Sequence, residues 1–207
     1  MHRKPTEIRQ EEIKQAVLKI IRTEGIKAIS TRNLANYTGL SEGAIFRHFK
    51  TKRDIIISII DDVAKDMIEK LRQVSIEKTE PDKRLFKYIC TTITYLSENN
   101  GITILLFTEA SHTNDTVMIE KLNYVFNSQR ELVGKIISDG IEYGIWDKDI
   151  SIDDATMLYM GIPITHNINL ILSKGENEKQ QFCNKMMTLF ERMLVKNSTS
   201  LNGQVIS

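Results

Sequence analysis

The stretch from Ser30 to Asp54, STRNLANYTGLSEGAIFRHFKTKRD, constrains the fold more than any other part of the chain. It predicts two short helices joined by a tight turn and followed at once by the start of a third helix. Ser30 and Ser41 carry side chains that cap helix N-termini well. Gly39, between the two helices, can adopt the left-handed backbone conformation that a sharp turn requires. A short helix held against a partner across such a turn is typical of helix-turn-helix DNA-binding proteins.

The second short helix has two different faces. Ala44, Ile45 and Phe49 can face inward along it, which leaves its polar and basic residues pointing outward. Thr51 and Asp54 then form a variant of the capping box, which predicts that the next helix opens near Lys52.

The run L-A-x-x-x-G-L-S-x-G-x-I-F-x-H-F-x-x-K resembles the N-terminal signature of the TetR family of bacterial transcriptional regulators. Several fixed spacings over about twenty residues make this match far more specific than a lone glycine pattern. Two positions depart from the family. Phe46 stands where a tyrosine usually reaches a phosphate, and Arg53 stands where an acidic residue is common. The matching positions are Leu34, Ala35, Gly39, Leu40, Ser41, Gly43, Phe46, His48, Phe49 and Lys52.

We expect residues 41–48 to enter the major groove of DNA. Gly43 and Ala44 have too little side chain to block a close approach, and Ala44 can meet a thymine methyl group. Lys52 should contact a phosphate, helped by the positive end of its helix. The residues expected at the DNA are Arg32, Ser41, Glu42, Gly43, Ala44, Phe46, Arg47, His48 and Lys52.

The charge of the chain is unevenly distributed. Residues 1–53 hold twelve Lys and Arg against five Asp and Glu, a net charge of +7. Residues 54–207 hold sixteen against twenty-two, a net charge of −6, so the whole chain carries only +1. A basic N-terminal quarter that coincides with the helix-turn-helix predicts that a polyanion binds on that side alone.

The remainder of the chain is predicted to be helical. Only three prolines and ten glycines occur in 207 residues, and no segment alternates like an amphipathic strand. We expect a first helix over residues 6–24, a long one over 52–75, a loop over 76–82, and further helices over 82–96, 102–111, 114–143, 153–172 and 176–196. The predicted fold is all-α with about nine helices. Residues 1–53 form the DNA-binding domain, residues 54–196 the ligand-binding and dimerisation domain, and residues 197–207 a flexible tail.

The last two predicted helices indicate a partner. Apolar residues recur at helical spacing along 153–172 and again along 176–196, although each stripe could be ordinary core. A helix-turn-helix of this kind usually reads two half-sites and so needs a two-fold partner. The resemblance also implies dimerisation through the last two helices, so we expect a homodimer.

The resemblance further implies a small-molecule pocket in the helical body. Met67, Phe107, Tyr124, Met160 and His166 combine apolar bulk with a few polar groups, as ligand cavities do, although ordinary core explains such residues equally well. Pro163 should kink or break its helix, because its ring clashes with the carbonyl group of Tyr159.

No catalytic or metal site is expected. Glu109 and His112 have the spacing used in di-iron helical bundles, but those sites need a second such pair, which is absent from the sequence. The two cysteines, Cys90 and Cys183, stand apart, and neither a signal peptide nor a membrane span is visible, which predicts a cytoplasmic protein.

The sequence therefore predicts a transcription regulator without enzymatic activity or cofactor. It would bind double-stranded operator DNA as a homodimeric repressor and leave it when a small, largely apolar ligand binds. The alternative is a helix-turn-helix protein that needs no ligand and acts through DNA binding and protein contacts.

Overall fold

The computed structural model describes residues 5–99, 102–172 and 179–195. Across these residues the chain forms α-helices and one short 3-10 helix, with no strand, which confirms the predicted all-α fold. Residues 1–4 and the predicted tail over 197–207 lie outside the described residues, as do 176–178 and 196 of the last predicted helix. The elements are α1 (Thr6–Glu24), η1 (Ile26–Ala28), α2 (Thr31–Thr38), α3 (Glu42–His48), α4 (Lys52–Ser75), α5 (Pro81–Glu98), α6 (Ile102–Thr113), α7 (Thr116–Glu142), α8 (Ile152–Leu172) and α9 (Lys179–Leu194).

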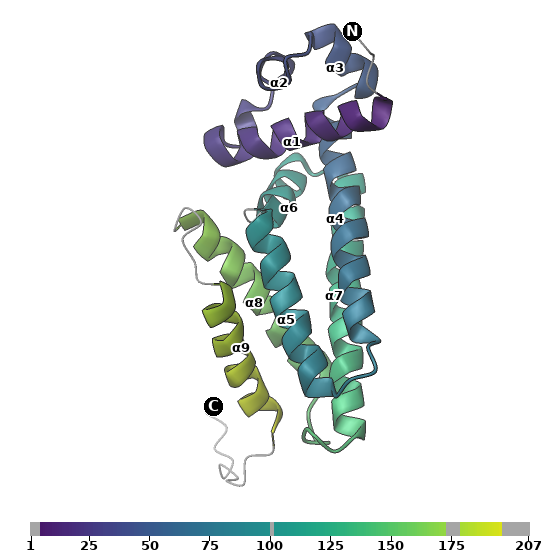
Figure 1. The fold of residues 1–207 in the computed structure, drawn as a ribbon, viewed down its shortest axis with the longest axis vertical. Coiled ribbons are helices and arrows are strands. Elements are labelled where there is room, and N and C mark those ends of the chain that lie inside the picture. The colour runs from purple at the N-terminus through teal and green to yellow at the C-terminus, as the bar shows by residue number, and fades with distance from the viewer. Residues whose placement is uncertain (1–4, 100–101, 173–178, 196–207) are drawn as a thin grey trace.

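Helices α1 to α3 form a head at one end of an elongated molecule, and α4 to α9 form its body (Figure 1). The head is built as its sequence predicts. The side chains of Ser30 and Ser41 accept hydrogen bonds from the backbone N–H groups of Asn33 and Ala44, which caps α2 and α3. Gly39 adopts the left-handed conformation between them, with φ of 66°. The sequence did not predict η1, which follows α1 directly.

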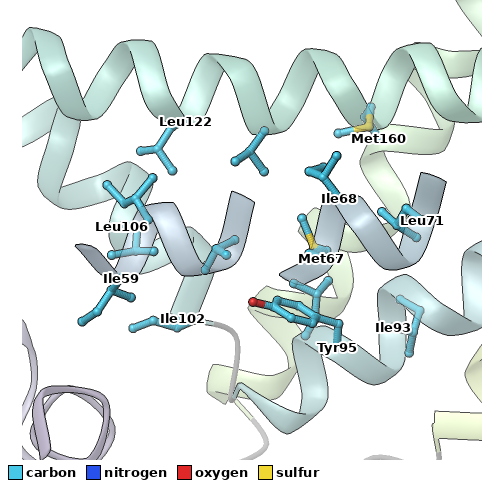
Figure 2. Close-up of a cluster of buried hydrophobic side chains, with 14 of the residues drawn as sticks. Ile59, Met67, Ile68, Leu71, Ile93, Tyr95, Ile102, Leu106, Leu122 and Met160 are labelled. Atoms are coloured by element: carbon cyan, nitrogen blue, oxygen red, sulfur yellow. The ribbon is translucent and has the colours of Figure 1, made fainter. Parts of the chain in front are cut away.

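Helix α4 joins the head to the body. Thr51 and Asp54 form the predicted capping box at its start, and α4 then packs along α7 and α5. Figure 2 shows part of the resulting core, in which Ile68 of α4 points toward α7, the helix of Leu122, and Met67 lies beside Tyr95 of α5. One face of the element that leads away from the head is thus buried in the core of the body.

Several helix ends of the body differ from the prediction by one or two residues, and so does the course of the chain at Pro163. Helix α5 begins at Pro81 instead of Asp82, because proline is well suited to the first helical position. Helix α8 runs through Pro163 without a break, since the packing of its neighbours outweighs the loss of one backbone hydrogen bond. None of the helices in the described ranges combines the length and apolar character needed to cross a bilayer.

The end of the body remote from the head is locked by buried contacts. Arg84 of α5 is 5% exposed and donates through Nη1 to the backbone oxygen of Ser75 at 2.9 Å and to the carboxylate of Asp139 at 2.7 Å. The ring of Trp146 lies directly on Gly140 of α7, where an added Cβ would come within 2.0 Å of it. Only glycine at this position allows that approach.

Candidate nucleic-acid interface and ligand cavity

Helix α3 presents an exposed, mixed polar and aromatic face away from the head. Glu42, Gly43, Phe46 and Arg47 are all exposed, and the ring of Phe46 is 45% exposed. Glu42 is held in place because the hydroxyl group of Thr31 donates a 2.8 Å hydrogen bond to its carboxylate. The arrangement offers a small, rigid set of side chains to a groove, as a recognition helix does.

Ala44 lies on the inward face of α3, which is one of the two positions that the sequence analysis gave it. It is only 8% exposed and packs inward with Ile45, which is fully buried. Little of its methyl group is accessible in this structure, and the expected contact with a thymine methyl group stays a prediction. The inward face predicted from Ala44, Ile45 and Phe49 is the one observed.

The start of α4 connects the head to two other helices of the body. The ammonium group of Lys52 lies 3.3 Å from the carboxylate of Glu109 in α6. Arg53 binds Asp115 with two donors, Nε to one oxygen and Nη2 to the other, the second at 2.9 Å. Hydrogen bonding with Arg53 is the largest cause that holds the pKa of Asp115 below its ordinary value.

Asp115 also caps α7 by accepting a hydrogen bond from the backbone N–H of Met118 at 3.2 Å. The unusual arginine at position 53 is thereby explained, since its cation is paired with the residue that begins α7. Sequence reasoning flagged Arg53 as a departure but could not name its partner, which is 62 residues away. Lys52, which we expected to contact a phosphate of DNA, pairs in this DNA-free structure with Glu109 of the body.

The body contains an apolar cavity of about 310 Å³. Helices α4, α5, α6, α7 and α8 all contribute to it. Three of the expected ligand-binding residues line it, namely Met67, Phe107 and Met160, and Pro163 lies in its wall. The rest of the lining includes Val63, Leu96, Val125 and Ile164, together with the polar side chains of Thr103, Gln129 and Asn167.

The other two expected ligand-binding residues do not reach this cavity. Tyr124 is 55% exposed on the outer side of α7. His166 is fully buried, but its Nε2 lies 2.9 Å from the hydroxyl group of Ser97, and its ring packs on Phe182 at 4.8 Å between centroids. Burial is the main cause that lowers the pKa of His166, so the ring is a neutral part of the packing between α5, α8 and α9.

An exposed apolar surface covers the outer faces of α8 and α9. Large side chains there remain accessible to solvent, including Leu158 at 57%, Leu172 at 76% and Leu189 at 58% exposure. A groove between the two helices is lined by further apolar groups such as Met186 and Met193. Contiguous apolar surface of this kind marks an interaction site.

Comparison with known proteins decides the family. Residues 13–59 match the family described as "Bacterial regulatory proteins, tetR family", and residues 60–190 match the family described as "YsiA-like protein, C-terminal region". The chain belongs to the TetR family. Its members are DNA-binding transcription regulators with an N-terminal helix-turn-helix, which confirms the resemblance seen in the signature.

Individual TetR-family relatives are distant in sequence. The "HTH-type transcriptional repressor KstR2" of Mycolicibacterium smegmatis is 20% identical over 145 residues, which cover 70% of this chain and 71% of that protein. The "Nucleoid occlusion factor SlmA" of Vibrio atlanticus is 26% identical over 119 residues, which cover 57% of this chain and 61% of that protein.

Solved structures share the whole fold. The fatty acid degradation regulator FadR of Bacillus halodurans superposes with a TM-score of 0.76 at 16% identity, covering 99% of this chain and all of that one. FadR of Bacillus subtilis, in complex with stearoyl-CoA, superposes with a TM-score of 0.72 at 19% identity, covering 87% of this chain and 96% of that one. These relatives are regulators rather than enzymes. In the part of the chain that the structure describes, no three His, Cys, Asp or Glu residues gather where they could hold a metal ion.

Proposed function

We propose that this chain is a homodimeric transcriptional repressor that leaves its operator when a largely apolar small molecule fills the body cavity. The observation that supports this most is the shared use of α4 and α6. Both helices line the cavity with Met67 and Phe107, and both hold the head junction through the Lys52–Glu109 pair. A ligand that displaces α6 or α4 therefore acts on the base of the DNA-binding head.

The ligand class is supported by the cavity and by one relative. The volume of about 310 Å³ lies at the lower end of the range for small-molecule sites, and the lining is almost entirely apolar. The Bacillus subtilis FadR structure was solved with stearoyl-CoA, a ligand with a long apolar chain. We propose a ligand of the same general character here, with an apolar portion enclosed by the body.

The homodimer is supported by the exposed apolar surface on α8 and α9. Leaving side chains such as Leu158 and Leu189 in water forgoes roughly 25 cal/mol for each Å² that a partner would cover. A two-fold partner also gives the second head that a palindromic operator requires. Association through these helices, as the sequence predicted, accounts for both features.

Release needs only a modest coupling energy. A tenfold loss of operator affinity corresponds to about 1.4 kcal/mol, which a ligand can supply only if it binds one arrangement of the heads better than the other. Lys52 can have a different partner in each arrangement. It is paired with Glu109 in this arrangement, and we propose that it contacts a phosphate in the operator complex.

We propose that Glu42, Gly43 and Arg47 lie nearest the base edges, with Glu42 held by Thr31 to accept a hydrogen bond from cytosine. Ser41 and Phe46 would contact the backbone, and Arg32 and His48 would contact phosphates. The ring of Phe46 is exposed enough to lie against a sugar, although it lacks the hydroxyl group of the usual tyrosine.

Lys52→Ala tests the DNA face. The variant should weaken binding to selected operator and to random duplex alike, and should flatten the salt dependence by about one unit of slope. Lys83→Ala removes the same charge from the opposite end of the molecule and should leave both quantities unchanged. Fluorescence anisotropy across a salt series measures them, with an operator selected from a random duplex pool. An unchanged slope in Lys52→Ala would remove Lys52 from the DNA contacts.

The second candidate function is a DNA-binding protein without a ligand, which the similarity to a nucleoid occlusion factor favours. The apolar cavity of about 310 Å³ supports the ligand-responsive function instead, since a body that served only as a dimerisation unit would gain stability by filling it.

A further inference from the structure

One wall of the cavity contains a buried side-chain amide of which only the N–H group has a hydrogen-bond partner. Asn167 of α8 is 5% exposed and lines the cavity. Its Nδ2 donates a 2.9 Å hydrogen bond to the hydroxyl group of Thr103 in α6. Its Oδ1 is buried and has no hydrogen-bond partner among the described residues. A buried carbonyl oxygen without a partner is unfavourable, and native proteins rarely keep one without a use.

The other amide in the cavity wall behaves differently. Gln129 of α7 directs its Nε2 toward the backbone oxygen of Val125, one turn earlier in the same helix, at 3.5 Å. Its backbone oxygen accepts a 3.0 Å hydrogen bond from the hydroxyl group of Tyr88. The side-chain N–H group and the backbone oxygen of Gln129 are thus engaged within the protein. Among the described side chains that line the cavity, Asn167 has the buried acceptor, Oδ1, that lacks a hydrogen-bond partner.

The charge of the lining limits what can approach this oxygen. None of the described residues in the cavity wall is charged. A carboxylate placed beside Oδ1 would meet an acceptor with no cation to balance it, and burying an unpaired charge is costly. A hydroxyl group or an amide N–H instead supplies the missing donor without any charge.

The cavity also has a place for a charged portion of a ligand to remain in water. Phe107 of α6 and Ile164 of α8 line the cavity and are 41% and 47% exposed, so the wall that they form reaches the surface of the body. A ligand can therefore enter with its apolar part, satisfy the buried amide, and leave any ionised group outside.

We propose that Asn167 is the polar anchor of the cavity and that it recognises a neutral hydrogen-bond donor, a hydroxyl group or an amide N–H, on an otherwise apolar ligand. This inference rests on the proposed function, in which the same cavity holds the effector. It excludes a free carboxylate as the group that the cavity encloses. The hydrogen bond between Asn167 and Thr103 connects α8 to α6. A ligand donor bound to Oδ1 therefore also affects the position of α6, the helix that carries Glu109.

Three probes separate donor recognition from apolar filling. Octanol carries a hydroxyl donor, its isomer heptyl methyl ether has the same atoms without a donor, and octanoate is charged. Calorimetry with the full chain should show octanol binding roughly tenfold tighter than either of the others, as expected for one satisfied hydrogen bond in a buried site.

Asn167→Leu should abolish the preference for octanol over the ether, because it replaces the amide with an apolar group of similar size. Asn167→Ala provides the same comparison with a side chain too small to clash, and thermal melting checks that both variants fold. Gln129→Met is the matched control. It changes the other amide of the wall and should shift octanol and ether affinity by the same factor.

Each outcome has a distinct meaning. Equal binding of octanol and ether to the unmodified chain, or a preference that survives in Asn167→Leu and Asn167→Ala, would overturn the anchor. Failure of all three probes to bind would overturn the anchor together with the cavity's proposed role. Binding in the predicted order without any effect on operator affinity would support the anchor and contradict the proposed release mechanism.

Discussion

The two ends of the body are held together by different kinds of contact. At the end beside the head, Lys52 and Arg53 are paired with Glu109 and Asp115, and the two cationic side chains are 38% and 47% exposed. At the remote end, the side chain of Arg84 is 5% exposed in its pair with Asp139. The carboxylates of Glu109 and Asp115 are only 15% and 11% exposed, so these pairs are partly buried, and the contrast between the two ends lies in the cations. A cation that reaches water exchanges its partner more easily than a buried one, whose loss is costly.

This contrast indicates which end can move. The remote end, with Arg84 and the Gly140–Trp146 contact, can serve as a fixed base for α4, α5 and α7. The end beside the head can rearrange at small cost, and the phosphates of DNA are alternative partners for its cations. The cavity lies between the two, so filling it should displace the end that is weakly held.

The largest effect is expected at Gly140. A Cβ there would approach the Trp146 ring within 2.0 Å, which neither helix backbone nor a buried indole can relieve by a small shift. Gly140→Ala should lower the free energy of unfolding by about 3 kcal/mol. Gly43→Ala, where an added Cβ meets nothing within 4 Å, is the control and should be neutral or slightly stabilising. Denaturant unfolding measures both, and similar stabilities would show that the remote end is not rigid.

A second pair of variants compares the two ends directly. Arg84→Met should cost about 2–3 kcal/mol, because it leaves the backbone oxygen of Ser75 and the carboxylate of Asp139 without their donor. Arg53→Met should change the unfolding transition far less, since its side chain is 47% exposed, against 5% for Arg84. If Arg53→Met proved as destabilising as Arg84→Met, the contacts between the start of α4 and the body would be rigid, which would contradict this account.

A third, smaller effect is expected at Met67, which lines the cavity and is 1% exposed. Met67→Ala should leave operator affinity without ligand nearly intact and change the ligand concentration for half-release by roughly tenfold, about 1.4 kcal/mol. Met67→Leu keeps the volume and should respond nearly as the unmodified chain does. Operator binding across an octanol titration measures this, and identical curves for all three proteins would place the transmission elsewhere.

The head could be predicted in detail because its signals are local. Ser30, Gly39, Ser41 and the Thr51–Asp54 capping box each act within three or four residues, so their spacing in the sequence fixes their geometry. Ala44 shows the limit of this reasoning. Its small side chain was compatible with a base contact, and its position along α3 was compatible with the core. In the structure it packs in the core.

The body could be predicted only as a set of helices. Periodicity indicates that a residue faces inward but not which neighbouring helix it meets. Met67 and Met160 therefore line the cavity, while the equally inward His166 packs against Ser97 and Phe182 instead. The sequence did not indicate that Asn167 or Thr103 belongs to the cavity. Their hydrogen bond joins residues 64 positions apart, which local patterns do not reveal.

The reciprocal effect of DNA on ligand binding tests the central claim most directly. If the cavity and the head are coupled, the factor by which octanol weakens operator binding must equal the factor by which operator weakens octanol binding. Calorimetric titration of octanol into the free protein and into its operator complex measures the second factor. We predict weaker octanol binding to the complex, by the same factor as the loss of operator affinity. Equal octanol affinity in both states would contradict the coupling of cavity to head.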